Sequence, residues 1–224
     1  MESLYNFVRR LENKWLVYAR HFYWGDRLDG RFFLAKQLKN VHNEKVLDLG
    51  CNAGIVLSEI DPSNFTIGLD LSMEALNIAQ TVSGKSKFLC ADMLNLPFKE
   101  ELFDSVVFLG MLELPEKGKK GNAIKEIHRI LKRGGKLFLT TQNRFYLRRK
   151  INKNYLNYSE VKSLLFNQFN FKILGFNPFP SFPYFIPNRI LSKIPFIWEL
   201  LILLMKIKIF TKVSCSFIVY GEKI

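Results

Sequence analysis

Cysteine is scarce in this chain, which has only Cys51, Cys90 and Cys215 in 224 residues. Three cysteines so far apart are too few for a disulfide framework or a zinc site, and no metal site is predicted. Cys51 and Cys90 follow predicted strands, where a small apolar side chain fits. We therefore expect a reducing, cytoplasmic setting.

The sequence also lacks an apolar run long enough to cross a membrane. The longest run, residues 194–205, is interrupted by Pro195 and Glu199. It covers about twelve residues, whereas a bilayer requires roughly 18 to 20. Charged residues such as Arg9 and Lys14 interleave with the first apolar residues, so no cleavable signal is expected.

A chain of 224 residues with 48% hydrophobic content is long enough for one α/β core and short for two. We predict a single domain over residues 1–224, with an N-terminal helical cap over 1–40, a core over 41–143 and a C-terminal part over 144–224. Apolar residues recur at helical spacing over residues 2–23, which predicts an amphipathic helix.

The most informative stretch begins with Val46–Leu49, a short apolar run that suits a strand buried on both faces. Gly50 and Gly54 follow, where the backbone can turn sharply and a ligand can approach closely. A helix is expected to open beside them, with its N-terminus facing the same spot. Asp70 lies about 20 residues after the first glycine, the spacing of an acidic residue that binds ribose hydroxyls. This pattern predicts a nucleotide-binding corner.

Strands and helices alternate along the core, which predicts a mostly parallel, doubly wound Rossmann-like sheet. The expected order is strand 45–49, helix 54–60, strand 65–69, helix 72–82, strand 87–90, strand 104–109, helix 121–132 and strand 135–141. A further helix is expected over 159–166, with Ser159 as its cap, and the last strands over 171–174 and 215–220.

Four motifs in chain order resemble those of class I S-adenosylmethionine-dependent methyltransferases. Asp48–Gly54 is similar to the first motif, with Asn52 in place of a usual glycine. Leu89–Phe98 resembles the third motif, Phe103–Gly110 the fourth strand, and Ile127–Leu139 the following helix, Gly-Gly turn and fifth strand. The resemblance implies a last strand that runs antiparallel between its neighbours.

The resemblance implies S-adenosylmethionine as cofactor and S-adenosylhomocysteine as product. Gly50 and Gly54 would pass the amino-acid part of the cofactor, and Asp70 would hold its ribose. Asp92 would accept a hydrogen bond from the adenine amine, with Met93 against the ring. The full predicted set of cofactor-binding residues is Asp48, Gly50, Asn52, Gly54, Asp70, Leu71, Asp92, Met93 and Leu109.

Simpler interpretations compete with these roles. The glycine-rich turn could be only a tight connection, and Asp70 and Asp92 could be helix caps. A nicotinamide-binding domain would share the glycines and Asp70 but gives no reason for Asp92. A methyltransferase-like protein that binds a partner without catalysis is a further alternative, because Asn52 replaces a usual glycine.

Candidate catalytic bases are few. A base is needed only if the acceptor must lose a proton. Glu113 lies in Gly110–Pro115, after the fourth core strand, where acceptor contacts are expected; alternatively it pairs with Lys117. His21 could line the acceptor side of the pocket, or could simply pack in the core. The segment Gly110–Pro115 lacks the Asn/Asp-Pro-Pro-aromatic sequence that amino methyltransferases of DNA share.

Basic residues concentrate near the C-terminus: residues 144–224 hold 13 basic and 3 acidic residues out of a net charge of +13. Residues 176–212 there are also apolar and rich in proline and phenylalanine. This insertion could be a buried helix hairpin or dimer face, an element that contacts an anionic membrane surface, or a nucleic-acid-binding surface. The nucleic-acid interpretation is the least favoured of the three, because a long apolar run does not contribute to RNA binding.

Together these patterns predict methyl transfer to a small-molecule, lipid or lipid-linked acceptor by in-line displacement. An RNA-directed methyltransferase is the alternative within the same class. We expect a cytoplasmic enzyme, peripheral to the inner face of the membrane if residues 176–212 bind there. The sequence does not indicate the oligomeric state.

Overall fold

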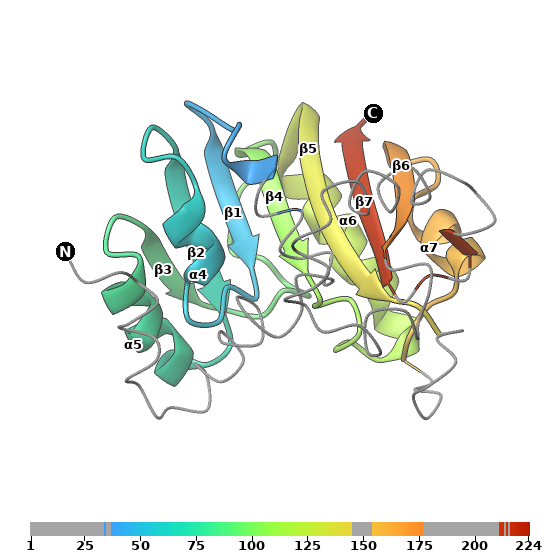
Figure 1. Ribbon diagram of the computed structural model, residues 1–224, viewed down its shortest axis with the longest axis horizontal. Coiled ribbons are helices and arrows are strands. Elements are labelled where there is room, and N and C mark those ends of the chain that lie inside the picture. Colours follow the sequence, from blue (N-terminus) through green and yellow to red (C-terminus); the bar gives the residue numbers. More distant parts are fainter. Residues whose placement is uncertain (1–33, 35–36, 145–153, 177–210, 213, 215) are drawn as a thin grey trace, which may run out of the picture.

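The computed structural model describes residues 34, 37–144, 154–176, 211–212, 214 and 216–224, and these form a seven-stranded sheet (Figure 1). Its strand order is β3-β2-β1-β4-β5-β7-β6. The strands are β1 (Lys45–Leu49), β2 (Phe65–Asp70), β3 (Lys87–Cys90), β4 (Phe103–Leu109), β5 (Leu131–Gln142), β6 (Phe169–Phe176) and β7 (Ser216–Lys223). Strands β1 to β5 pair in parallel, and β7 pairs antiparallel with both β5 and β6. The predicted fold class and the antiparallel last strand are confirmed.

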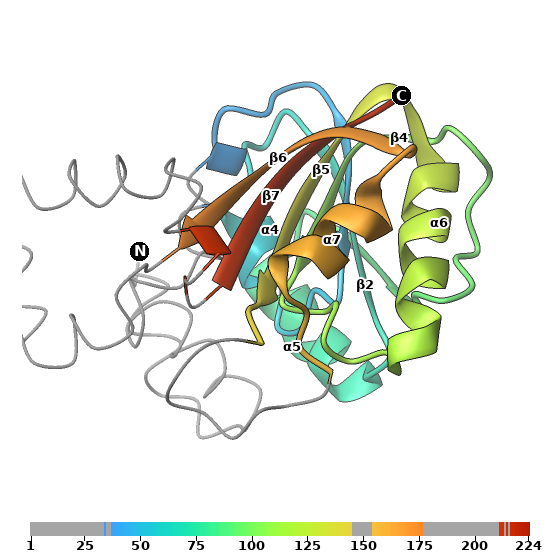
Figure 2. The ribbon, with the colours of Figure 1, turned by 90° about the vertical axis from the view of Figure 1, so that its right-hand side faces the viewer.

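Helices cover both faces of the sheet. Those whose bounds lie within the described residues are α4 (Ile55–Glu59), α5 (Met73–Val82), α6 (Lys120–Ile130) and α7 (Tyr158–Leu165), and a short 3₁₀ turn, η2 (Lys117–Lys119), precedes α6. Figure 1 shows α4 and α5 in front of the sheet, and Figure 2 shows α6 and α7 together on its other side. Each face of the central strands is therefore buried.

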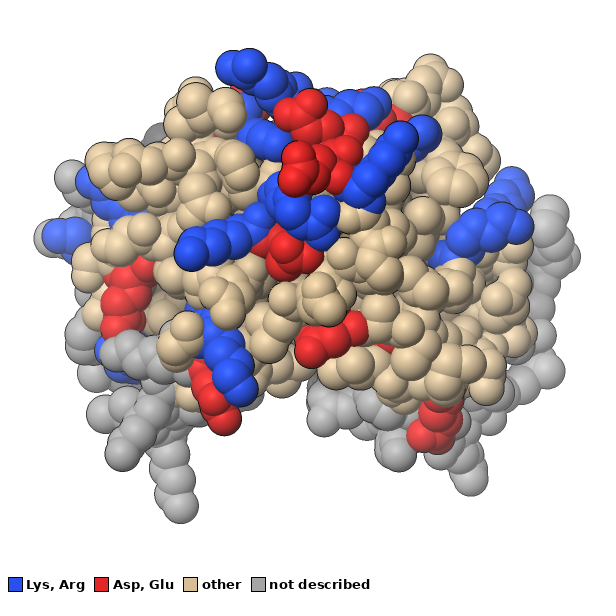
Figure 3. All heavy atoms as spheres, turned by 180° about the vertical axis from the view of Figure 1, so that it is seen from behind, with Lys and Arg blue, Asp and Glu red and all other residues tan. Residues whose placement is uncertain are grey.

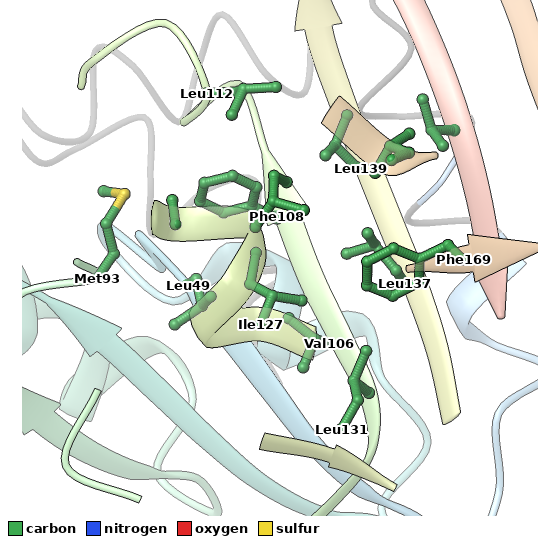
Figure 4. Packing of buried hydrophobic residues seen from close by; sticks show 14 of the residues in the cluster. Leu49, Met93, Val106, Phe108, Leu112, Ile127, Leu131, Leu137, Leu139 and Phe169 are labelled. Atoms are coloured by element: carbon green, nitrogen blue, oxygen red, sulfur yellow. The ribbon is translucent and has the colours of Figure 1, made fainter. Parts of the chain in front are cut away.

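Side chains of β4 alternate between two hydrophobic clusters, as the pleat of a strand requires. Val107 packs with α4 and α5, while Val106 and Phe108 pack with α6 and α7. Figure 4 shows the second cluster, which includes Phe108, Ile127 and Leu49, with Met93 at its edge. Met93 thus ties the segment after β3 to the core.

Charged side chains of opposite sign interleave on the face shown in Figure 3. Two ion pairs lie where the parallel strands begin: Lys136 Nζ is 2.6 Å from Glu44 Oε1, and Lys132 Nζ is 2.6 Å from Asp104 Oδ1. Exposed pairs of this kind contribute at most about 1 kcal/mol each. The ion pairs therefore neutralise much of the charge at this end of the sheet.

Several element boundaries differ from the sequence-based expectation: β5, β6 and β7 are all longer than expected, and the ends of α6 and α7 differ for reasons that the structure shows. Helix α6 ends at Ile130 rather than 132, because β5 begins at Leu131, which pairs with Phe103 across an irregular register. Helix α7 is capped by Asn157 and not by Ser159. Asn157 accepts from the Glu160 N–H while Glu160 accepts from the Asn157 N–H, a reciprocal capping box that a single cap residue does not predict.

Several predictions lie outside the described residues. They include the helix over 2–23, His21 and nearly all of the insertion over 176–212, so its three interpretations stay open. In the described part of the chain, no helix combines the length and apolar character that spanning a bilayer requires.

Candidate cofactor and acceptor site

The turn after β1 is closed by hydrogen bonds to the end of β2. The N–H groups of Gly50 and Cys51 donate to the Leu69 carbonyl, at 2.7 and 3.0 Å. The Asp70 carboxylate then accepts from the Asn52 N–H at 3.0 Å and from the Ser72 N–H at 3.0 Å. Asp70 therefore joins two turns at the carboxyl edge of the sheet.

Asn52 adopts the left-handed backbone region that its position requires, with φ of 49°. Asparagine tolerates this region better than most residues other than glycine. Its side-chain oxygen accepts from the Ala53 N–H at 2.6 Å, so the side chain folds back onto its own turn. The substitution of the usual glycine is accommodated by the local backbone.

Gly50 and Gly54 also have positive φ, of 74° and 70°, but they meet different neighbours. A Cβ at Gly50 would overlap the side chain of Met111, which lies directly over this glycine. A Cβ at Gly54 would lie 2.9 Å from the Cβ and 3.1 Å from the Cα of Ala79. Gly54 therefore lets α4 and α5 approach each other closely.

Gly54→Ala is expected to lower the free energy of unfolding by about 2–4 kcal/mol, because it combines left-handed strain with a clash against the backbone of α5. Gly121→Ala is the matched control, since no atom lies within 4 Å of a Cβ there and the helix favours alanine. Urea unfolding of both variants measures the difference. Equal stabilities would contradict the role given to Gly54.

A cavity of about 300 Å³ lies at the carboxyl ends of β1, β2 and β4 and along the segment after β3. It is lined by Gly50, Leu69, Asp70, Leu71, Ala91, Asp92, Met93, Leu94, Met111, Leu114 and Pro115. The strand order reverses between β1 and β4, and ligands of open α/β sheets bind at such a switch point. The cavity is therefore in the position where this fold binds ligands.

Five of the nine predicted cofactor residues line this cavity: Gly50, Asp70, Leu71, Asp92 and Met93. The other four, Asp48, Asn52, Gly54 and Leu109, do not. Asn52 and Gly54 build the turn beside the cavity, and Leu109 is buried at the end of β4. Their direct contact with a cofactor stays a prediction.

Asp48 lies behind the cavity in the middle of the sheet. Its side chain is 3% exposed, and its Oδ2 atom has no hydrogen-bond partner in the part of the chain that the structure describes. Burial, with the negative charge of Asp70 nearby, raises the pKa of the Asp48 carboxyl to about 7. The Asp48 carboxyl therefore keeps its proton up to about neutral pH.

Asp92 begins the turn that follows β3. Its Oδ1 atom accepts from the Leu94 N–H at 2.9 Å, and its carbonyl accepts from the Asn95 N–H at 3.2 Å. Its side chain is exposed and lines the cavity, while Met93 beside it is buried. A carboxylate next to an apolar wall suits a flat ring with an amino substituent.

Glu113 does not line the cavity. Its Oε1 atom accepts from the Gln142 N–H at the end of β5, and its Oε2 atom is buried without a described partner. Burial raises the pKa of the Glu113 carboxyl, opposed by the Gln142 N–H and the charge of Lys120. Lys120 is itself only 1% exposed and donates to the Leu112 carbonyl. The predicted catalytic role of Glu113 stays a prediction.

Glu126 and Arg129 were not among the predicted site residues, although they contact the segment that continues from the cavity lining. Both hold the chain just after Asp92 and Met93, through Leu96 and Phe98. Their spacing of three residues on the polar face of a helix was the available signal. No three His, Cys, Asp or Glu side chains of the described residues gather as a metal site would require.

The sequence is similar to a methyltransferase family model and to several proteins from different organisms. The sequence model described as a methyltransferase domain matches residues 47–139. An uncharacterized protein of Methanocaldococcus jannaschii is 34% identical over 184 residues, covering 74% of this chain and 73% of the relative. A demethylmenaquinone methyltransferase of Lactiplantibacillus plantarum is 30% identical, covering 56% of this chain and 54% of that enzyme.

A tRNA (carboxymethyluridine(34)-5-O)-methyltransferase of Arabidopsis thaliana is 34% identical over 42% of this chain, but the match covers only 23% of that enzyme. Among solved structures, N-methyltransferase NodS of Bradyrhizobium japonicum with S-adenosylhomocysteine has a TM-score of 0.62 at 15% identity, covering 99% of both chains. The chain belongs to the class I S-adenosylmethionine-dependent methyltransferases. Its cofactor is S-adenosylmethionine.

Proposed function

We propose that this methyltransferase acts on an apolar small-molecule acceptor of the isoprenoid or lipid class. The observation that carries the proposal is the wall of the cavity formed by Met111, Leu114 and Pro115. Leu114 is 64% exposed. Apolar side chains at an open rim favour an apolar ligand over solvent.

The charge of the cavity supports the same acceptor class. Its only charged lining residues among those described are Asp70 and Asp92, and neither lysine nor arginine lines it. RNA binding depends on basic side chains that neutralise phosphates. The alternative of a tRNA acceptor is favoured by the relationship to the plant enzyme, and the test below distinguishes the two.

The cofactor fits the residues present. The Asp70 carboxylate lies at the cavity wall, with further lone pairs beside its two N–H partners that could accept from ribose hydroxyls. Asp92 would accept from the adenine amine, with Leu71 and Met93 against the ring faces. When bound, S-adenosylmethionine supplies a methyl group already activated on a sulfonium. The turn over Gly50 to Gly54 would then hold the amino-acid part.

The chain's own contribution to the reaction is alignment and exclusion of water. Met111, Leu114 and Pro115 would pack against the acceptor and orient it toward the methyl group. Glu113 could accept a proton from the acceptor only if its carboxyl turned away from Gln142 toward the cavity. An acceptor that needs no base would react without it.

The test is transfer of a radiolabelled methyl group from S-adenosylmethionine to isoprenoid quinone precursors in detergent, beside a matched reaction with unmodified tRNA. We expect label in the organic extract and none in the RNA. Label in the RNA alone would overturn the proposal in favour of the tRNA alternative, and label in neither would overturn the acceptor class.

Leu114→Lys is expected to lower methyl transfer to the apolar acceptor by about 10-fold, because a charge would enter the apolar wall. Phe166→Lys is the matched control, since Phe166 is 62% exposed but lies at the end of α7, away from the cavity. Calorimetry with S-adenosylhomocysteine should give the wild-type affinity for both variants. Equal transfer rates would remove Leu114 from the acceptor wall.

A further inference from the structure

Helix α6 holds the segment that follows Asp92 and Met93 through three hydrogen bonds. The Leu96 N–H donates to Glu126 Oε2 at 2.8 Å. The Arg129 guanidinium donates to the Leu96 carbonyl at 2.9 Å and to the Phe98 carbonyl at 2.7 Å. A segment without regular secondary structure thus has its backbone groups paired by one helix, some thirty residues further along the chain.

The two side chains also fix each other. Arg129 Nε lies 2.9 Å from Glu126 Oε1 and Arg129 Nη2 lies 2.8 Å from Glu126 Oε2, a two-point contact. The hydrogen bond from Arg129 lowers the pKa of the Glu126 carboxyl, so both groups are charged at neutral pH. A planar guanidinium held at two points retains little freedom for its remaining donors. We call this pair the Glu126–Arg129 fork.

The Glu126–Arg129 fork contacts the chain only a few residues after Asp92, the residue proposed to bind adenine. Leu96 is buried and Phe98 packs edge-to-face on Phe103, with ring centroids 5.0 Å apart. Between Asp92 and Leu96 the chain makes a single turn closed by the Asn95 N–H and by the Asp92 carboxylate itself. Leu96 is therefore joined to Asp92 through one hydrogen-bonded turn.

We propose that the Glu126–Arg129 fork is a positioning device that makes the site selective for adenine. It acts by holding the Asp92 carboxylate in the position from which it accepts a hydrogen bond from the exocyclic amino group of adenine. The inference rests on the proposed adenine contact of Asp92. The fork does not line the cavity, so it acts through the segment 92–98 and not by touching the cofactor.

The probe is a pair of ligands, S-adenosylhomocysteine and its hypoxanthine analogue, in which an oxygen replaces the exocyclic amino group of adenine. A carboxylate that accepts from the amine would face this oxygen, so we expect the wild type to prefer adenine by about 10- to 100-fold. Calorimetry measures both affinities without requiring an acceptor. The preference, and not the affinity itself, is the quantity compared between variants.

Arg129→Met is expected to reduce the preference for adenine by about 5-fold or more, because it frees the carbonyls of Leu96 and Phe98. Lys132→Met is the matched control, since it removes an ion pair with Asp104 near the same end of the helix without touching the segment. Its preference should equal that of the wild type. Glu126→Ala provides a second test through the Leu96 N–H if Arg129→Met does not fold, as judged by circular dichroism.

Asp92→Ala separates a wrong contact of Asp92 from a wrong role of the fork, because alanine offers no acceptor to the adenine amino group. If Asp92→Ala keeps the full preference for adenine, the proposed contact of Asp92 is wrong. If Asp92→Ala loses the preference while Arg129→Met and Glu126→Ala keep it, the contact stands and the fork has only a structural role. Loss in Asp92→Ala and in a fork variant, with none in Lys132→Met, supports the proposal.

Discussion

Asp70→Ala is expected to weaken the binding of S-adenosylhomocysteine by about 30- to 1000-fold, or about 2–4 kcal/mol. The carboxylate is the shared acceptor for the Asn52 and Ser72 N–H groups, so its removal frees the turn after β1 and the turn before α5 together. Its proposed contact with the ribose would be lost as well. Calorimetry with the product measures the effect directly.

Asp61→Ala is the matched control for this experiment. Asp61 also accepts a hydrogen bond from a backbone N–H, that of Ser63, at 2.9 Å, but in the loop between α4 and β2. We expect this variant to bind S-adenosylhomocysteine as the wild type does. Unchanged binding in Asp70→Ala would remove Asp70 from the cofactor site and would reopen the hypothesis that the corner is only a tight connection.

Asp48→Asn is expected to raise the free energy of unfolding at pH 8 by about 2–4 kcal/mol. Folding raises the pKa of Asp48 from 3.8 to about 7, so the folded protein retains a proton that the unfolded chain releases. Between about pH 4 and pH 7 the stability of the wild type therefore falls as the pH rises, by about 1.4 kcal/mol per unit from this group. Asparagine cannot ionise and removes that loss.

The pH dependence distinguishes this cause from a general packing effect. At pH 4.5 the gain from Asp48→Asn should be only about 1 kcal/mol, because this pH lies less than one unit above the unfolded pKa of 3.8 and the loss has only begun. Denaturant unfolding at the two pH values measures the difference. An equal gain at both pH values would show that the burial of Asp48 does not perturb its ionisation.

Asp104→Asn provides a comparison of opposite sign. Burial alone would raise the pKa of Asp104, but hydrogen bonds from Lys132 and from the Lys45 N–H lower it below its usual value. This carboxylate stabilises the fold above its unfolded pKa, and the stabilisation is lost as the pH falls through its folded pKa. Asp104→Asn should therefore destabilise the protein at pH 8, where Asp48→Asn stabilises it.

The turn after β1 and the positions of the two aspartates at the cavity were predictable because they depend on local sequence and on neighbouring strands. Short apolar runs predict buried parallel strands, and a strand followed by Gly50 predicts a turn with positive φ, as the structure has it. Asp70 and Asp92 end or follow neighbouring strands, and the carboxyl ends of parallel strands share one edge of the sheet. Their meeting at one cavity follows from the strand order alone.

Side-chain direction was not predictable in the same way. Position in the chain made Glu113 a candidate base, yet its carboxylate turns inward onto the Gln142 N–H. The contact of Gly54 with the cofactor stays a prediction, and its close approach to Ala79 of α5 was not foreseen. Both outcomes depend on segments 25 to 29 residues away, which no local pattern specifies.

The residue types along the chain thus determine the doubly wound fold, the methyltransferase class and the acidic residues at the cavity, since each follows from backbone preferences and apolar periodicity over a few neighbouring positions. Tertiary structure alone decides that Asp48 is buried beside Asp70, that Glu113 faces Gln142 and that the Glu126–Arg129 fork holds Leu96. Burial and hydrogen-bond partners depend on which distant segments pack together, and those contacts set the ionisation and the position of each group.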